Sequence, residues 1–175
     1  LAEEMGLSED ERRVLEFASM LHDVGRIGIS EAILTKAGTL EPNEYSVIKE
    51  HPVIGEQILK PLEFLDQERE IIRHHHERWN GQGYPDRLKG EQISLLTRIL
   101  TVADAFDAMT SERPYRSDIS VDEALTRLIA GAGTQFDPQL IRIFVAMAQK
   151  PDFQALMKQK IVAPAGVDDS QTVYP

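Results

Sequence analysis

The sequence contains no cysteine and no long apolar run, and each absence excludes a class of structure. Without cysteine there can be no disulfide bond and no thiolate ligand, so any bound metal must use nitrogen and oxygen donors. No apolar stretch approaches the roughly 20 residues that a helix needs to cross a bilayer, and no signal peptide is recognisable. We therefore expect a cytoplasmic protein without a membrane span.

Basic residues are scarce relative to acidic ones. The chain has 19 lysines and arginines against 29 aspartates and glutamates, which gives a formal net charge of −10. Broad nonspecific binding to nucleic acid requires many cations that neutralise phosphates, so we expect no DNA partner. A single small nucleotide remains compatible with this charge, because metal ions and a few local arginines can neutralise its phosphates.

Helical patterns, in contrast, are present along nearly the whole chain. Its 175 residues, 42% of them hydrophobic, suit one soluble domain with its own core. Apolar side chains at helical spacing define two stripes that we expect to face inward: Val14, Phe17, Ala18 and Leu21, and Ile99, Val102, Ala103 and Phe106. No alternating run is long enough to predict a strand. The sequence therefore predicts an all-α fold.

Several residues predict where helices begin and end. Ser8 and Glu11 form a capping box at the start of the first helix. Pro52 disfavours helical geometry at His51, which predicts a break between two helices there. We expect Asp66 to cap the helix that precedes the histidine cluster. The glycine- and proline-rich segment 80–92 predicts a loop.

The five histidines are not scattered, since four of them stand in short motifs that also contain or adjoin a carboxylate or proline. His22 is followed by Asp23, His51 by Pro52, and the pair at 75 and 76 by a glutamate and a glycine-rich turn. Histidine and carboxylate bind divalent metals. A carboxylate has two oxygens and can bridge two ions, and ions about 3.5–4 Å apart can hold a phosphate for in-line attack. The distribution predicts a metal centre built from several helices.

The motifs resemble the HD-GYP family, a branch of the HD metal-dependent phosphohydrolases. They occur in family order over about residues 1–148: HDVGRIGI, KAGTL, HPVIG, HHERWNGQGYP, TRILTVADAFDAMTSERPYR and GTQFDP. Each motif alone has an ordinary structural explanation, but such explanations do not account for the ordered set. The resemblance implies a compact multi-helix HD-GYP domain at residues 1–150, lacking the start of its first helix, and a C-terminal helix, tail or linker at 151–175.

The resemblance also implies a ligand set for two divalent ions. Asp23 bridges the ions, and His22 and Asp104 bind one of them, together with an upstream histidine that this sequence lacks. The other ion is bound by three histidines, His51, His75 and His76. Iron or manganese suits such a site best, with zinc, nickel and cobalt left open. Because one ligand is missing, we expect one ion to bind weakly.

Two neighbours of these ligands receive different roles. His74 lies outside the family positions, and we interpret it as a non-ligand. Glu77 follows the histidine pair, and we expect it to orient a histidine or a metal-bound water.

For the substrate, the resemblance implies cyclic di-GMP, hydrolysed to pGpG in bacterial second-messenger signalling, with GMP left open as a further product. The expected catalytic residues are Asp23 and Arg26. Family members usually carry lysine where Arg26 stands, and arginine binds phosphate but does not release a proton at neutral pH. Arg113 and Arg116 match positions that contact the phosphates, so their joint replacement by alanine should weaken binding. Tyr84 is expected to pack on the base or to hold the loop.

Two alternatives remain at this point. The chain could be a catalytically weak cyclic di-GMP sensor or GGDEF-interaction module, which the missing histidine and Arg26 favour. It could also hydrolyse another nucleotide, against which the GYP and RPYR motifs argue. The resemblance further implies GGDEF-domain partners bound through the GYP loop and an N-terminal receiver or sensor domain in the full-length protein, and it leaves a dimer open.

Overall fold

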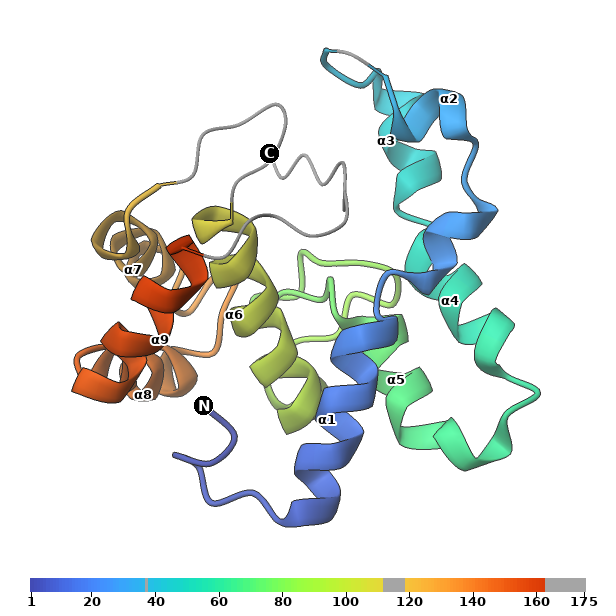
Figure 1. Ribbon diagram of the computed structural model, residues 1–175. Coiled ribbons are helices and arrows are strands. Elements are labelled where there is room, and N and C mark those ends of the chain that lie inside the picture. The colour runs from blue at the N-terminus through green and yellow to red at the C-terminus, as the bar shows by residue number, and fades with distance from the viewer. Residues whose placement is uncertain (37, 112–118, 163–175) are drawn as a thin grey trace.

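The computed structural model describes residues 1–36, 38–111 and 119–162, with 158–162 as backbone only, and these ranges contain helices but no strand (Figure 1). The helices are α1 Glu9–Leu21, α2 Glu31–Leu34, α3 Pro42–Ile48, α4 His51–Leu59, α5 Asp66–His74, α6 Leu95–Thr110, α7 Val121–Ala130, α8 Pro138–Ala148 and α9 Pro151–Val162. Short 3₁₀ turns are η1 Val24–Gly28, η2 Glu63–Leu65 and η3 Gly90–Gln92. The predicted all-α fold is confirmed.

Helix α6 runs through the middle of the molecule and separates two groups of helices (Figure 1). On one side it contacts α1 and α5, and α5 in turn packs on α4. On the other side it contacts α7 and α8. Leu100 joins Ala18 and Ile71 in the first core, whereas Val102 and Phe106 belong to the larger second core. No helix within the described ranges is both long and apolar enough to cross a membrane.

Burial on α1 and α6 departs from the predicted apolar stripes at two positions. Phe17 is 46% exposed, while Val14 and Ala18 of the same stripe pack inward. Ala103 is also exposed, although Val102 beside it is fully buried. Other helices cover α6 on two faces and α1 mainly on one. The width and direction of each buried face therefore depend on neighbouring helices, which the spacing of apolar residues in the sequence does not reveal.

The helix ends follow local chemistry in most places. The capping box of α1 is confirmed, since Ser8 accepts from the Glu11 backbone N–H and Glu11 accepts from that of Ser8. The predicted cap at Asp66 is wrong, because η2 runs directly into α5 and Asp66 already lies inside the first helical turn. Its carboxylate accepts from Arg69 instead.

The break at His51 is confirmed, and it positions two parts of the site. Helix α3 ends at Ile48 and α4 begins with His51 as its first residue. The backbone of η1 lies directly against this start, since a Cβ atom on Gly25 would be only 1.9 Å from the His51 carbonyl oxygen. Only glycine permits such an approach. The contact brings Asp23, just before η1, next to His51.

Candidate metal centre and nucleotide pocket

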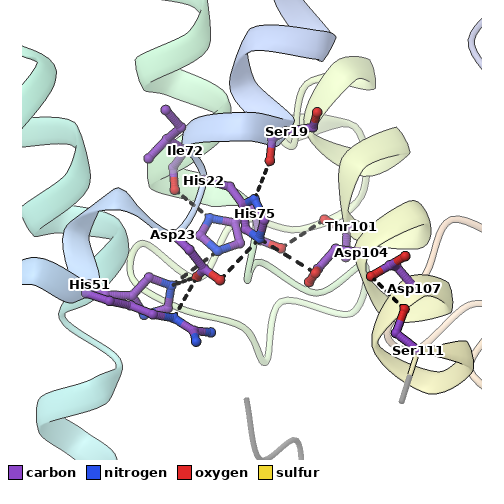
Figure 2. Close-up of polar contacts among 11 residues, drawn as sticks. Ser19, His22, Asp23, His51, Ile72, His75, Thr101, Asp104, Asp107 and Ser111 are labelled. Atoms are coloured by element: carbon purple, nitrogen blue, oxygen red, sulfur yellow. Dashed lines mark hydrogen bonds and ion pairs between the residues drawn. The ribbon is translucent and has the colours of Figure 1, made fainter. Parts of the chain in front are cut away.

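Helix ends and one helix face bring the expected ligands together. His22 caps the C-terminus of α1, His51 opens α4, and His75 directly follows α5. Figure 2 shows these side chains, with Asp23 beside them and Asp104 on α6, pointing toward one common region. These residues are far apart in the sequence, and the packing of α1, α4, α5 and α6 brings them together.

Asp23 occupies the centre of this region. Its Oδ2 is 3.4 Å from His22 Nε2, and its Oδ1 is 3.4 Å from His51 Nε2. His22 Nε2 also lies 3.7 Å from Asp104 Oδ1. Asp23 therefore presents one oxygen toward His22 and the other toward His51, an arrangement that would suit a carboxylate shared by two ions.

Three histidines form a compact donor group on the second side. Ring nitrogens of His51, His75 and His76 all lie within 4.8 Å of one another. His51 and His75 are each only 1% exposed, and their Nε2 atoms are 3.3 Å apart. Their Nδ1 atoms lie 2.8 and 2.6 Å from the carbonyl oxygens of Ile48 and Ile72. A carbonyl can only accept, so Nδ1 carries the proton of each neutral ring.

Both Nε2 atoms then carry lone pairs that face each other. Two lone pairs at this separation repel, and a cation between them removes the repulsion. Burial lowers the pKa of His75 to about 3 and also lowers those of His51 and His76. These rings are therefore neutral near pH 7, which is the form that binds a metal. The donor set fits a divalent ion.

His22 differs in its electrostatics. Burial disfavours its charged form, but the hydrogen bond and charge of Asp23, together with Asp104, raise the pKa of His22 to about 9. Its Nδ1 donates to the Ser19 carbonyl 2.7 Å away, so the additional proton lies on Nε2, between the two carboxylates. A metal cation would take the place of that proton. Burial raises the pKa of Asp23, but the hydrogen bond and charge of His22, together with the charge of Arg26, hold this pKa below its usual range.

The GYP loop, which is segment 80–92 with the signature Gly83-Tyr84-Pro85, folds back over the histidine group. The Tyr84 ring stacks on His76, with 4.9 Å between ring centroids. A Cβ atom on Gly83 would lie 2.4 Å from the Arg78 backbone nitrogen, so only glycine allows the loop to come this close. The glycine of the signature thereby places Tyr84 against the expected ligand His76.

Asp86 follows Pro85 of the GYP loop and holds this loop against α5. It accepts hydrogen bonds from Arg73 at 2.7 and 3.0 Å, and His74 Nε2 lies 2.8 Å away. The Arg73 contacts lower the pKa of Asp86 to about 2. Glu77 Oε1 accepts the Asp86 backbone N–H at 2.6 Å. Glu77 thus supports the loop backbone, while its expected role toward a histidine or a metal-bound water stays a prediction, and His74 faces Asp86.

These positions lead to a prediction for metal content. His74→Ala should leave the metal content nearly unchanged, because His74 contacts Asp86 and not the donor group. His75→Ala and His76→Ala should each lower it, since each removes a nitrogen from that group. Elemental analysis of the three variants, purified with the same excess of manganese, measures this directly. A large loss in His74→Ala alone would mean that the ligand register is shifted by one residue.

A cavity of about 380 Å³ opens beside the histidines. Its wall includes His75, His76 and Asp104 from the cluster and Tyr84 from the GYP loop. Other lining residues were not anticipated from the sequence, and they include Tyr45, Lys49, Arg127 and Gln135. Two of them stand near sequence motifs, since Lys49 lies two residues before His51 and Gln135 belongs to the GTQFDP motif. The expected phosphate contacts Arg113 and Arg116 lie outside the described residues.

Comparisons with known proteins agree with this architecture. The HD domain family model matches residues 1–140. The cyclic di-GMP phosphodiesterase response regulator RpfG of Xanthomonas campestris is 46% identical over 81% of this chain and 38% of its own length. A cyclic di-GMP phosphodiesterase of Thermotoga maritima is 40% identical over 86% of this chain and 41% of its own.

A solved structure extends the likeness to three dimensions. A crystal structure described as a cyclic GMP-AMP specific phosphodiesterase of Vibrio cholerae has a TM-score of 0.70 and 26% identity, over 94% of this chain and 46% of that one. The chain thus spans less than half the length of these relatives. It belongs to the HD domain family, and the resemblance of its motifs to the HD-GYP branch is confirmed.

Proposed function

We propose that this domain hydrolyses a phosphodiester bond of cyclic di-GMP in a metal-dependent reaction that gives linear pGpG. The observation that carries the proposal is the pair of mutually facing Nε2 lone pairs on His51 and His75, next to the open cavity. A cation held there would lie where a nucleotide in the cavity can present a phosphate. The relatives named as cyclic di-GMP phosphodiesterases support the choice of substrate.

The donor atoms divide into two groups that would hold two ions. His51, His75 and His76, with Asp23 Oδ1, would bind the first. His22 and Asp104, with Asp23 Oδ2, would bind the second, more weakly because fewer protein donors face it among the described residues. Iron or manganese is the proposed metal, as suits an all-histidine and carboxylate site. When bound, divalent ions supply charge neutralisation at the phosphate and a nucleophile at neutral pH.

Arg26 and Tyr84 would act on the substrate side of the cluster. Arg26 Nε lies 2.9 Å from Asp23 Oδ1, so its guanidinium stands at the edge of the metal centre. Because it stays charged, it can stabilise a phosphate but cannot serve as a proton donor. Burial, with nearby Tyr45, raises the pKa of Tyr84 above its ordinary value, so its hydroxyl keeps its proton and can donate a hydrogen bond.

A substrate panel tests this proposal. The manganese- or iron-loaded protein is incubated with cyclic di-GMP, 3′3′-cyclic GMP-AMP, cyclic di-AMP and 2′,3′-cyclic AMP, and the products are separated by chromatography. We expect cyclic di-GMP to be cleaved fastest, to pGpG, and a chelator to stop the reaction. Faster cleavage of the cyclic mononucleotide would contradict the assignment. Tight binding of cyclic di-GMP without cleavage would support a sensor instead.

Partners beyond the substrate stay predictions from the family resemblance. They are GGDEF-domain proteins at the GYP loop, a receiver or sensor domain elsewhere in the full-length protein, and a second copy of the chain.

A further inference from the structure

Lys49 lies on the cavity wall at the junction of α3 and α4. Its Nζ is 4.5 Å from the centroid of the Tyr45 ring and 5.5 Å from that of Tyr84. Tyr84 in turn stacks on His76. The ammonium group is therefore one aromatic ring away from the histidine group, and the tyrosine rings provide a favourable surface for its charge.

The charge of Lys49 is not compensated by a carboxylate within the part of the chain that the structure describes. Several other cations in this acidic protein have such partners: Lys36 pairs with Glu44, Lys150 with Glu4, and Arg127, which also lines the cavity, with Glu123. Arg78 of the cavity wall resembles Lys49 in having no ion pair among the described residues. Among the described residues, the Lys49 ammonium lies over these two rings and forms no ion pair. Its three N–H donors remain available to an anion that enters the cavity.

A cyclic dinucleotide has two phosphodiester groups, and only one can lie at the metal centre during cleavage. The other must lie elsewhere in the cavity, where an anion requires a cation or several donors. Arg26 is adjacent to Asp23, so it would serve a phosphate at the metal centre. Lys49 lies over Tyr84, which stacks on His76, so it would serve a group farther from that centre.

We propose that Lys49 binds the second, uncleaved phosphate of the cyclic dinucleotide, and that Tyr45 and Tyr84 hold its side chain in place. This inference rests on the proposed function, because it requires a substrate with two phosphates. It makes Lys49 a residue that favours cyclic dinucleotides over phosphodiesters with a single phosphate.

Two substrates separate the two phosphate sites. Lys49→Gln removes the charge but keeps most of the side-chain length, Lys49→Arg keeps the charge, and Lys60→Gln changes an exposed lysine at the far end of α4. KM and kcat are measured for cyclic di-GMP and for bis(p-nitrophenyl) phosphate, which has one phosphate. We expect Lys49→Gln to raise KM for cyclic di-GMP about 10- to 100-fold, with little change in kcat.

The same variant should leave both constants for bis(p-nitrophenyl) phosphate unchanged. Lys49→Arg should retain most of the affinity for cyclic di-GMP, and Lys60→Gln should match the wild type with both substrates. Metal content and Tm, which should equal those of the wild type, establish that Lys49→Gln leaves the fold intact. An unchanged KM for cyclic di-GMP, or an equal loss with both substrates, would overturn the assignment.

Binding of a phosphorothioate analogue of cyclic di-GMP distinguishes this inference from the proposed function. If the wild type binds the analogue but cleaves no cyclic dinucleotide, the proposed function fails. A weaker Kd in Lys49→Gln would then still support the role of Lys49, and an equal Kd would overturn it. If the wild type neither binds nor cleaves a cyclic dinucleotide, both proposals are overturned.

Discussion

Replacing Asp23 by alanine is expected to abolish turnover of cyclic di-GMP and to lower the metal content more than any other single substitution. Both oxygens of Asp23 face histidine nitrogens, so its loss removes a donor from each side of the cluster at once. We expect kcat to fall by at least about 10³-fold, the upper end of what a single electrostatic contact contributes. Steady-state kinetics with saturating manganese, together with elemental analysis of the same samples, measure both effects.

Two further variants make this result specific. Asp23→Asn keeps the shape but not the charge, and it should also lose metal, because an amide is a weaker ligand that cannot balance two cations. Asp66→Ala removes a carboxylate from the first turn of α5, outside the cluster, and should behave as the wild type. Retention of both metals and the wild-type rate in Asp23→Ala would show that the bridging assignment is wrong.

Gly25→Ala is expected to disrupt the site from outside the ligand set. The added methyl group would lie 1.9 Å from the His51 carbonyl oxygen and 2.5 Å from the Gly55 backbone nitrogen. These are backbone atoms, so η1 and α4 must separate, which moves Asp23 away from His51. Overpacking of this kind lowers the free energy of unfolding by about 1–3 kcal/mol or more. Thermal unfolding, metal content and turnover should all decrease together.

Gly28→Ala is the matched control, because it lies in the same turn. There the nearest atom, 2.8 Å from the added carbon, is Cγ2 of the Ile54 side chain. A side chain can rotate where a backbone cannot, so Gly28→Ala should lower Tm less and should leave the metal content close to that of the wild type. A Gly25→Ala protein with wild-type Tm and metal content would contradict the role given to the η1–α4 contact.

The sequence predicted those parts of the molecule that depend on local chemistry. The capping box at Ser8 and the break at His51 depend on neighbouring residues, and both are confirmed. The motifs containing His22 and Asp23 also identified residues that the fold brings together, although their role as ligands is still a proposal. The order of the motifs was enough to identify these residues, because the resemblance to the family indicates how the helices pack. No local sequence pattern contains that information.

Features that depend on distant neighbours could not be predicted. Phe17 fits the helical stripe of α1, yet it is 46% exposed, because the placement of the other helices decides which part of the stripe is buried. Lys49 and Tyr45 line the cavity together with Tyr84 of the GYP loop, which is far away in the sequence. The expected role of Glu77 toward a histidine or a metal-bound water stays a prediction, but its Oε1 also accepts the Asp86 backbone N–H, a partner that its motif does not indicate.

The central claim is that the cluster around Asp23 is a metal centre that cleaves cyclic di-GMP. Its most direct test is an anaerobic titration of chelator-treated protein with manganese or iron(II), in which bound metal and pGpG formation are measured on the same samples. We predict no cleavage by the metal-free protein and a rate that rises with bound metal until the cluster is filled. Cleavage by the metal-free protein, or a filled cluster that produces no pGpG, would contradict the account.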